Sequence, residues 1–219
     1  GAGSAGTSIR APSFGGAVIE IGEAGDLHMQ DLEIRDFLYT RNLGRLTLED
    51  VAMGFGAEAI YNEAYSQLYV WNTRIATGNE TGGLYNWGFA SIRDSEIVNN
   101  SGAYDGGGVR NWGHIYIYKS LIARNSCHVP YTFECGLDNQ ARLAVLTNTT
   151  ISGNLGHGHP STAAVVATGG SVTLSYVTLA ANNTAYEIIV NEDAEVKLSN
   201  TIAFNELSST ECSGAGSVT

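Results

Sequence analysis

Residues 82–100 read GGLYNWGFASIRDSEIVNN, and residues 107–125 repeat the same pattern as GGVRNWGHIYIYKSLIARN. Each segment opens with glycines, an apolar residue and, two positions later, an asparagine, and then alternates apolar and polar residues. Alternation with a period of two predicts short, half-buried strands, and Gly, Asn and Asp between the strands predict tight corners. Neither segment has apolar residues at helical spacing. A unit that recurs in this way indicates a repeat architecture.

The same unit extends in both directions from this stretch. It recurs every 19 to 29 residues, with first apolar residues at Leu27, Leu46, Leu68, Ala90, Ile115, Ala144, Val172 and Val196. One coil cannot bury its apolar face alone, but coils stacked about 4.8 Å apart align like residues into a continuous core. The sequence therefore predicts an all-β fold, a right-handed parallel β-helix of about eight coils.

We expect the β-helix to span residues 16–205, after a flexible segment or linker at residues 1–15 and before a tail or cap at residues 206–219. A leucine-rich repeat has a similar period. That fold needs a helical or extended return leg with Leu-x-x-Leu-x-Leu spacing, whereas the return legs here are rich in Gly and β-branched residues.

Asparagines recur at two positions of the unit. The first set is Asn62, Asn86, Asn111 and Asn139, and the second is Asn100, Asn125, Asn154, Asn182 and Asn205. An amide at the same corner of successive coils can bond to the next coil and to its own turn. We therefore interpret the first set as a structural ladder rather than a ligand site.

Charge and length exclude several partners. The 219 residues carry a formal net charge of -11. Phosphate binding needs clustered Lys and Arg, so we expect no nucleic acid partner. No apolar run reaches the length of a membrane span, so we expect no membrane insertion.

Three cysteines occur, at positions 127, 135 and 212. A local bridge between Cys127 and Cys135 is favoured over free thiols, because the two lie in one loop. Cys212 is then a free thiol, or a partner for something outside this chain.

The phrases at residues 82–86, 106–111 and 148–154, GGLYN, GGGVRN and NTTISGN, resemble bacterial secreted or surface β-helix repeat proteins. That group overlaps the polymorphic outer-membrane-protein repeats and is similar in architecture to pectate lyases. The resemblance implies an extracellular or cell-surface setting and a β-helix, but no particular reaction, since fold analogy does not decide function.

Aromatic residues recur at matching positions of different coils. The pairs are Trp87 with Trp112, Tyr61 with Tyr85, Tyr69 with Tyr116, and Trp71 with Tyr118. Alternation places them on the outside, where they form a flat strip suited to sugar rings or to a protein surface. A cross-coil ladder that shields a sheet from solvent is the equal alternative.

Catalytic and metal-binding patterns are weak. Polygalacturonase-like hydrolysis needs paired carboxylates, and the chain offers Gly156-His157-Gly158 without an Asp-Asp pair. Lyase chemistry needs calcium carboxylates near a basic Arg, for which the candidates are Arg93, Asp94, Arg110, Lys119, Glu96, Asp105 and Asp138. His157 and His159 lack a visible third metal ligand. We predict no catalytic residues and no cofactor or metal, with calcium as the open alternative.

The sequence thus favours a non-catalytic extracellular solenoid, which acts as an adhesin or as a structural or filament subunit and assembles end to end. The alternative is a polysaccharide-binding module, or a polysaccharide lyase or hydrolase, that uses the aromatic strip and the loop face.

Overall fold

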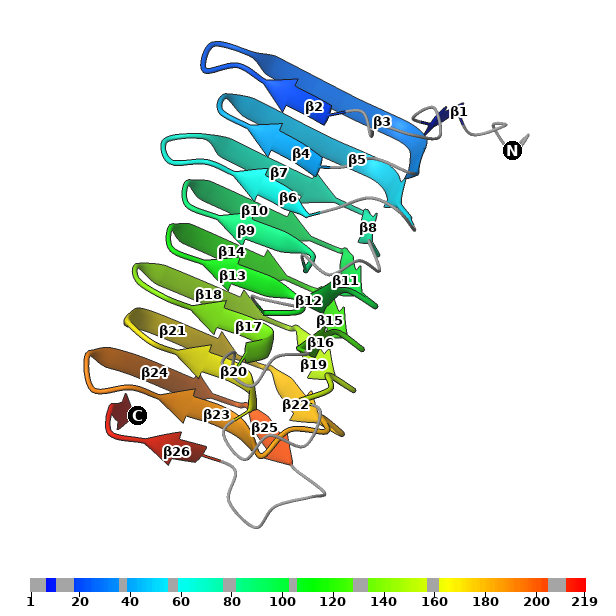
Figure 1. Ribbon diagram of the computed structural model, residues 1–219. Helices are drawn as coiled ribbons and strands as arrows, with labels where there is room; N and C mark the ends of the chain where they lie inside the picture. The colour runs from blue at the N-terminus through cyan, green and yellow to red at the C-terminus, as the bar shows by residue number, and fades with distance from the viewer. Residues whose placement is uncertain are drawn as a thin grey trace.

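The computed structural model describes residues 7–10, 18–35, 39–54, 59–76, 82–102, 106–127, 134–156, 162–204 and 212–219. These residues form strands and contain no helix. The strands stack as parallel rungs of a right-handed β-solenoid, with β1 near one end of the stack and β26 at the other (Figure 1). The predicted fold is confirmed. It has about seven turns, close to the eight coils expected.

One face of the solenoid is a nine-stranded sheet, which we call the front sheet. Its strands in order are β2 (Val18–Ile21), β4 (Tyr39–Asn42), β6 (Ile60–Asn62), β9 (Leu84–Asn86), β13 (Val109–Asn111), β17 (Glu134–Asn139), β20 (Ala163–Ala167), β23 (Tyr186–Val190) and β26 (Cys212–Gly214).

The remaining faces belong to a 16-stranded sheet with two limbs. Its back limb contains β3 (Asp26–Arg35), β5 (Arg45–Met53), β7 (Gln67–Trp71), β10 (Phe89–Arg93), β14 (His114–Tyr118), β18 (Leu143–Thr147), β21 (Gly170–Ser175), β24 (Ala194–Ser199) and β27 (Ser217–Val218). Its side limb contains β1 (Thr7–Arg10), β8 (Arg74–Ile75), β11 (Glu96–Val98), β15 (Leu121–Ala123), β19 (Thr150–Ser152), β22 (Thr178–Ala180) and β25 (Ile202–Phe204). The long strands β3 and β5 run through both limbs. A separate small sheet pairs β12 (Ser101–Gly102) with β16 (Ser126–Cys127).

The apolar positions of the repeat stack in register and form the core. Leu46 pairs with Leu68, Leu68 with Ala90, and Ala90 with Ile115 in successive coils. These side chains are all buried. Because each coil contributes the same inward positions, the core continues along the stack without a break between coils.

One residue in each coil, at the corner between the back limb and the side limb, adopts a left-handed backbone conformation. Its φ angle lies between 44° and 55° in eight coils, at Asp31, Asp50, Asn72, Asp94, Lys119, Asn148, Tyr176 and Asn200. Asp and Asn tolerate this conformation better than most residues, which explains why they dominate the corner position of the sequence motif.

The strands extend past the expected boundaries of the solenoid. At one end, Thr7–Arg10 pairs with the second half of β3. At the other, Cys212–Gly214 pairs with β23, and Ser217–Val218 pairs with β24. Residues 212–219 therefore add a further partial coil at this end of the stack.

Candidate binding face

Four of the aromatic residues singled out by the sequence lie together on the outer side of the front sheet. Tyr61 and Tyr85 occupy the middle of β6 and β9 and pair in register. Trp87 and Trp112 each follow a ladder asparagine, and the backbone N–H of each donates to the asparagine carbonyl of the preceding coil at 2.8 Å. The same turn is thus built twice, which places the two indoles one above the other.

The glycine after each tryptophan lets this turn pack closely against its neighbour. A Cβ on Gly113 would lie 2.0 Å from the carbonyl oxygen of Gly88. Any side chain there would push the two coils apart, so the Trp-Gly dipeptide in the sequence reflects the spacing of the coils.

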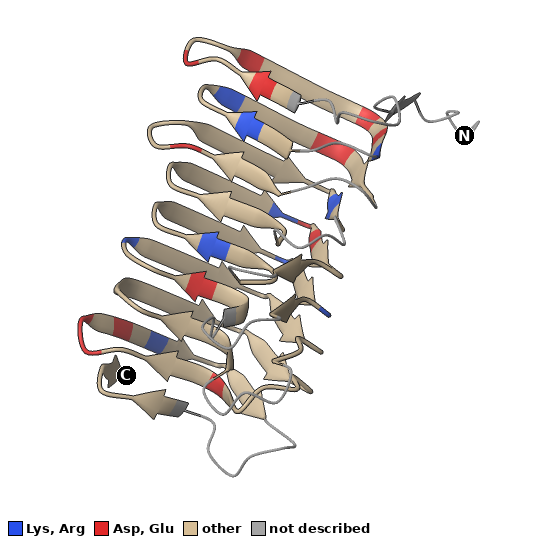
Figure 2. Ribbon diagram, viewed as in Figure 1, with Lys and Arg blue, Asp and Glu red and all other residues tan. Residues whose placement is uncertain are grey.

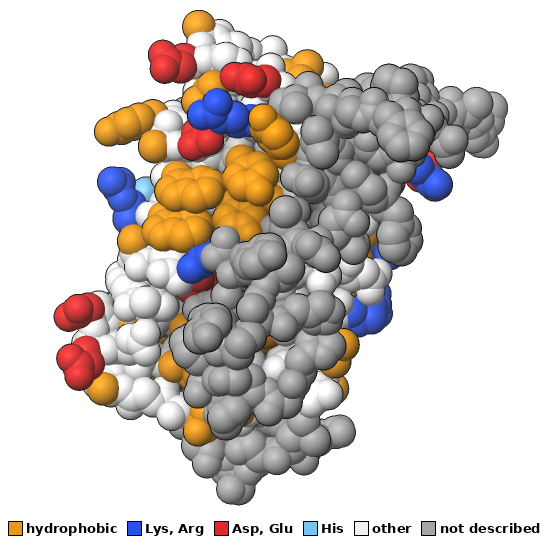
Figure 3. Space-filling view, viewed as in Figure 1, with side chains coloured by type: hydrophobic (Ala, Val, Ile, Leu, Met, Phe, Trp, Pro, Cys, Tyr) orange, Lys and Arg blue, Asp and Glu red, His pale blue; other side chains and the backbone are white. Residues whose placement is uncertain are grey.

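The four rings, Tyr61, Tyr85, Trp87 and Trp112, form what we call the aromatic block. The Tyr61 and Tyr85 rings stack with centroids 5.1 Å apart and planes 11° apart, and the two indoles stack at 4.7 Å and 4°. The two columns lie 5.9 to 6.4 Å from each other, with all planes within 15°. Figure 3 shows this gathering of hydrophobic side chains beside basic groups.

Stacking along the coils changes what the block presents to a partner. Ring faces within each column cover one another, so the rings turn their edges outward and leave a face only at the two ends of each column. Tyr85, which stacks on Tyr61 and lies beside both indoles, is only 6% exposed although it points away from the core. Alternation fixes the side of the sheet on which these residues lie but not the planes of their rings, and the rings of this group stack from coil to coil as a cross-coil ladder does.

An arginine covers one end of the aromatic block. The Arg110 guanidinium carbon lies 4.8 Å from the centroid of the Trp112 ring. Arg110 also donates from Nε to the Asp138 carboxylate at 2.8 Å, and that carboxylate is fully buried. The cation–π contact and the ion pair together fix this end of the block.

The opposite end of the block opens into a hollow of about 360 Å³ lined by Tyr39, Arg41, Tyr61 and Glu63. The Tyr39 ring meets the Tyr61 ring edge to face, at 5.9 Å and 86°. Arg41 donates a hydrogen bond from Nε to Oε1 of Glu63 at 2.9 Å. Its Nη1 lies 3.9 Å from Oε1 of Glu20. The hydrogen bond and charge of Glu63 raise the pKa of Arg41, so its guanidinium stays charged.

The other four predicted aromatics lie on the back limb, away from the aromatic block. Tyr69 and Tyr116 share a column, with the Phe89 ring between them at 5.9 and 5.7 Å. Trp71 and Tyr118 share the next column, with the Arg93 guanidinium between them at 5.5 and 5.6 Å. The eight residues therefore make two separate groups rather than one strip. Matching aromatic residues between coils did not identify Phe89 and Arg93 as members of these columns. Both occupy back-limb positions in register with polar or aromatic residues of the neighbouring coils.

The predicted asparagine ladder is a continuous chain of buried amides. Asn62 donates to Asn86, Asn86 to Asn111, and Asn111 to Asn139, at 2.6 to 2.7 Å. Asn42 adds a rung at the start, donating to Asn62 at 2.8 Å. A second ladder joins Asn100, Asn125, Asn154 and Asn182 in the same way.

Cys127 and Cys135 form a disulfide, as predicted. It links β16 to β17 beside the front sheet, and both cysteines are buried. The side chain of Cys212 lies outside the described residues, so its fate stays a prediction.

The acidic and basic residues that the sequence suggested for lyase chemistry lie on different faces of the solenoid. Arg93 is paired with Asp94 at the end of the back limb, Glu96 with Arg74 on the side limb, and Arg110 with Asp138 on the front sheet. Asp105, His157 and His159 lie outside the described residues. Figure 2 shows charges of both signs spread along the rod rather than gathered in one cluster.

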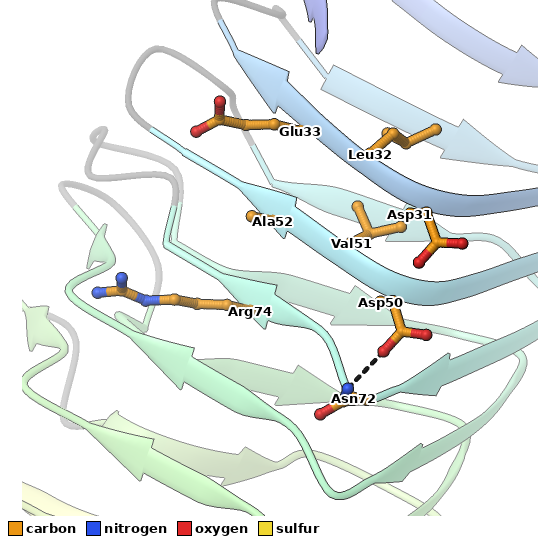
Figure 4. A pocket seen from close by; sticks show the side chains of 8 residues that line it. All are labelled: Asp31, Leu32, Glu33, Asp50, Val51, Ala52, Asn72 and Arg74. Atoms are coloured by element: carbon orange, nitrogen blue, oxygen red, sulfur yellow. Dashed lines mark hydrogen bonds between the residues drawn. The ribbon is translucent and has the colours of Figure 1, made fainter. Parts of the chain in front are cut away.

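The corner column forms a second hollow, of about 430 Å³, between the back and side limbs. Asp31, Asp50 and Asn72 line one side of it, where Asn72 donates to Asp50, and Glu33 and Arg74 extend from the other side (Figure 4). Within the described ranges, no three His, Cys, Asp or Glu side chains are placed to hold a metal ion. The prediction about cofactors stays untested.

Comparison with known proteins gives no match. No family model, no curated protein sequence and no solved structure matches this chain. In the part of the chain that the structure describes, no helix is long and apolar enough to cross a membrane. Function therefore has to be argued from the faces of the solenoid alone.

Proposed function

We propose that the chain is a non-catalytic extracellular β-solenoid that acts as a surface adhesin, with the outer face of the front sheet as its binding face. The observation that carries this proposal is the aromatic block. Aromatic side chains and arginine are enriched in protein interfaces, and here both occur together on a rigid sheet.

Two further observations support an extracellular setting. A disulfide forms and persists in oxidising environments, such as secreted proteins and cell surfaces. The GGLYN and NTTISGN phrases of the sequence resemble secreted and surface repeat proteins. The rod also suits an adhesin mechanically, because in-register parallel strands and buried amide ladders hold its binding face in one geometry.

The test is adhesion of the intact, non-reduced chain to surfaces coated with glycans or with extracellular proteins. We expect the chain to adhere to at least one surface, and the double variant Trp87→Ala/Trp112→Ala to lose at least tenfold in affinity, as truncated interface aromatics do. Tyr65→Ala is the matched control, because Tyr65 is a fully exposed aromatic at the turn after β6 and outside the block.

Circular dichroism of each variant separates lost binding from lost folding. Adhesion to no surface would reject the adhesin function. Equal adhesion of the folded double variant and the parent would reject the front sheet as the binding face.

A second candidate function is end-to-end assembly as a structural subunit. It is favoured by the last described coil, where the large apolar side chains of Ile202, Phe204 and Val218 are 64%, 53% and 42% exposed. The strands β25, β26 and β27 that form this coil are also the last strands of their sheets. Unpaired strand edges with exposed apolar residues pair readily with another chain.

A further inference from the structure

The hollow lined by Tyr39, Arg41, Tyr61 and Glu63 lies where the tyrosine column of the aromatic block ends. Tyr61 stacks on Tyr85 on one side. In the preceding coil the same register position is held by Arg41 instead of a ring. The hollow therefore begins where a further ring of the column would continue.

The walls of this hollow combine a ring with a preorganised polar pair. Tyr39 stands edge-on to Tyr61 and closes one side. Arg41 and Glu63 are held together at 2.9 Å, with 42% and 31% of their side chains exposed. A guanidinium offers only donors and a carboxylate only acceptors, so the pair presents both kinds of group side by side. Adjacent hydroxyl groups, each a donor and an acceptor, complement such a pair.

The charges around the hollow select against an anionic ligand. Among the described residues, Arg41 is the one basic side chain that lines it, and it already faces the carboxylates of Glu63 and Glu20. The chain as a whole carries a net charge of -11. A uronic acid or a nucleotide phosphate would meet repulsion here, whereas a neutral ligand would not.

We propose that this hollow is a monosaccharide subsite for a neutral hexopyranose, which packs its C–H face beside Tyr61 and bonds its hydroxyls to Arg41 and Glu63. The volume of about 360 Å³ is in the range of small-molecule sites, which are built from apolar walls with a few placed polar groups. This inference rests on the proposed adhesin function and names its ligand class.

The test is saturation-transfer NMR on the intact chain with methyl α-glucopyranoside, methyl α-mannopyranoside and methyl α-galactopyranoside, and with a methyl glucuronide as the anionic comparison. We expect saturation of at least one neutral pyranoside and a weaker signal from the glucuronide. Glu63→Gln keeps the side-chain shape but removes the charge-assisted acceptor, and Arg41→Lys removes the planar fork. Each is expected to weaken binding about tenfold, as the loss of a hydrogen bond to a charged group does.

Matched controls lie on the back limb. Glu49→Gln changes a carboxylate that is also 31% exposed and also bonded, to His28. Arg45→Lys changes an arginine that is likewise paired with an acidic residue, Asp26. Both are expected to leave pyranoside binding unchanged.

Three results would overturn the subsite: no saturation of any neutral pyranoside, stronger binding of the glucuronide, or equal binding by the parent and the two hollow variants. The outcomes remain distinct from those for the adhesin function. Trp87- and Trp112-dependent adhesion without pyranoside binding rejects the subsite alone. Pyranoside binding that depends on Glu63, without adhesion to any surface, rejects the adhesin function alone.

Discussion

At the scale of single residues, the corner column shows how one backbone conformation selects the sequence. Six of its eight positions are Asp or Asn, and the exceptions are Lys119 and Tyr176. An L-residue other than Gly, Asn or Asp pays roughly 1–2 kcal/mol in this conformation. The Asp and Asn residues of the repeat make this corner predictable from the sequence. At Lys119 and Tyr176 the residue type gives no such signal, and the corner is recognised only because both residues stack in register with the others.

At the Tyr176 corner, we expect one substitution to stabilise the chain and another to destabilise it. Tyr176 has a φ of 55° and is 60% exposed, so its ring adds little packing to offset the backbone cost. We expect Tyr176→Asn to raise the free energy of unfolding by about 0.5–1 kcal/mol and Tyr176→Val to lower it, because a β-branched residue is least tolerant of positive φ. Denaturant midpoints measure both changes.

The reciprocal variant is the control for this prediction. Asn148 holds the same corner one coil earlier in the column, with a φ of 51° and an exposed side chain. Asn148→Tyr should therefore destabilise the chain. Changes of the same sign for Tyr176→Asn and Asn148→Tyr would show that backbone conformation does not govern this column.

At the scale of elements, strand positions follow from the sequence, but contacts between side chains follow only in part. The asparagine ladder was predictable because four coils repeat an apolar residue and an asparagine two positions apart. The sequence pattern did not identify its first rung, Asn42, because the apolar position before it is held by a polar residue, Thr40. Thr40 is buried, with 2% of its surface exposed. The ring planes of the aromatic block could not be predicted for a different reason. A period of two specifies which side of a sheet a residue faces but does not specify its rotamer.

The ladder predicts a large effect from its central rung. The Asn111 amide accepts from Asn86, donates to Asn139 at 2.7 Å, and donates to the carbonyl of Gly113 at 3.0 Å. Asn111→Ala leaves buried donors and acceptors without partners in two neighbouring coils, and we expect it to lower the free energy of unfolding by about 2–4 kcal/mol.

Thermal or denaturant unfolding checks this, with the exposed Asn191→Ala as the control, which we expect to change stability by no more than about 0.5 kcal/mol. A loss for Asn111→Ala no larger than that for Asn191→Ala would mean that the ladder amides add specificity of register but no stability.

At the scale of the whole molecule, the two ends of the rod differ in chemistry. The last described coil exposes Ile202, Phe204 and Val218, whereas the first described coil carries Glu20, Glu23 and Asp26. The strong net negative charge makes copies of the chain repel one another, and salt screens that repulsion with a Debye length near 10 Å at 0.1 M. Any end-to-end contact through the apolar coil should therefore strengthen as the salt concentration rises.

Light scattering and negative-stain microscopy on non-reduced protein test this assembly. If the last coil mediates it, we expect filaments with a repeat of ~34 Å, the length of about seven turns at 4.8 Å each, and more assembly at high salt. Ile202→Asp/Phe204→Asp should dissociate them, because it places charges in the contact. Tyr65→Asp/Tyr176→Asp, which adds the same two charges at exposed corners of other coils, should leave them intact. A monodisperse monomer at every salt concentration would contradict assembly and leave the front sheet as the functional surface of a single rod.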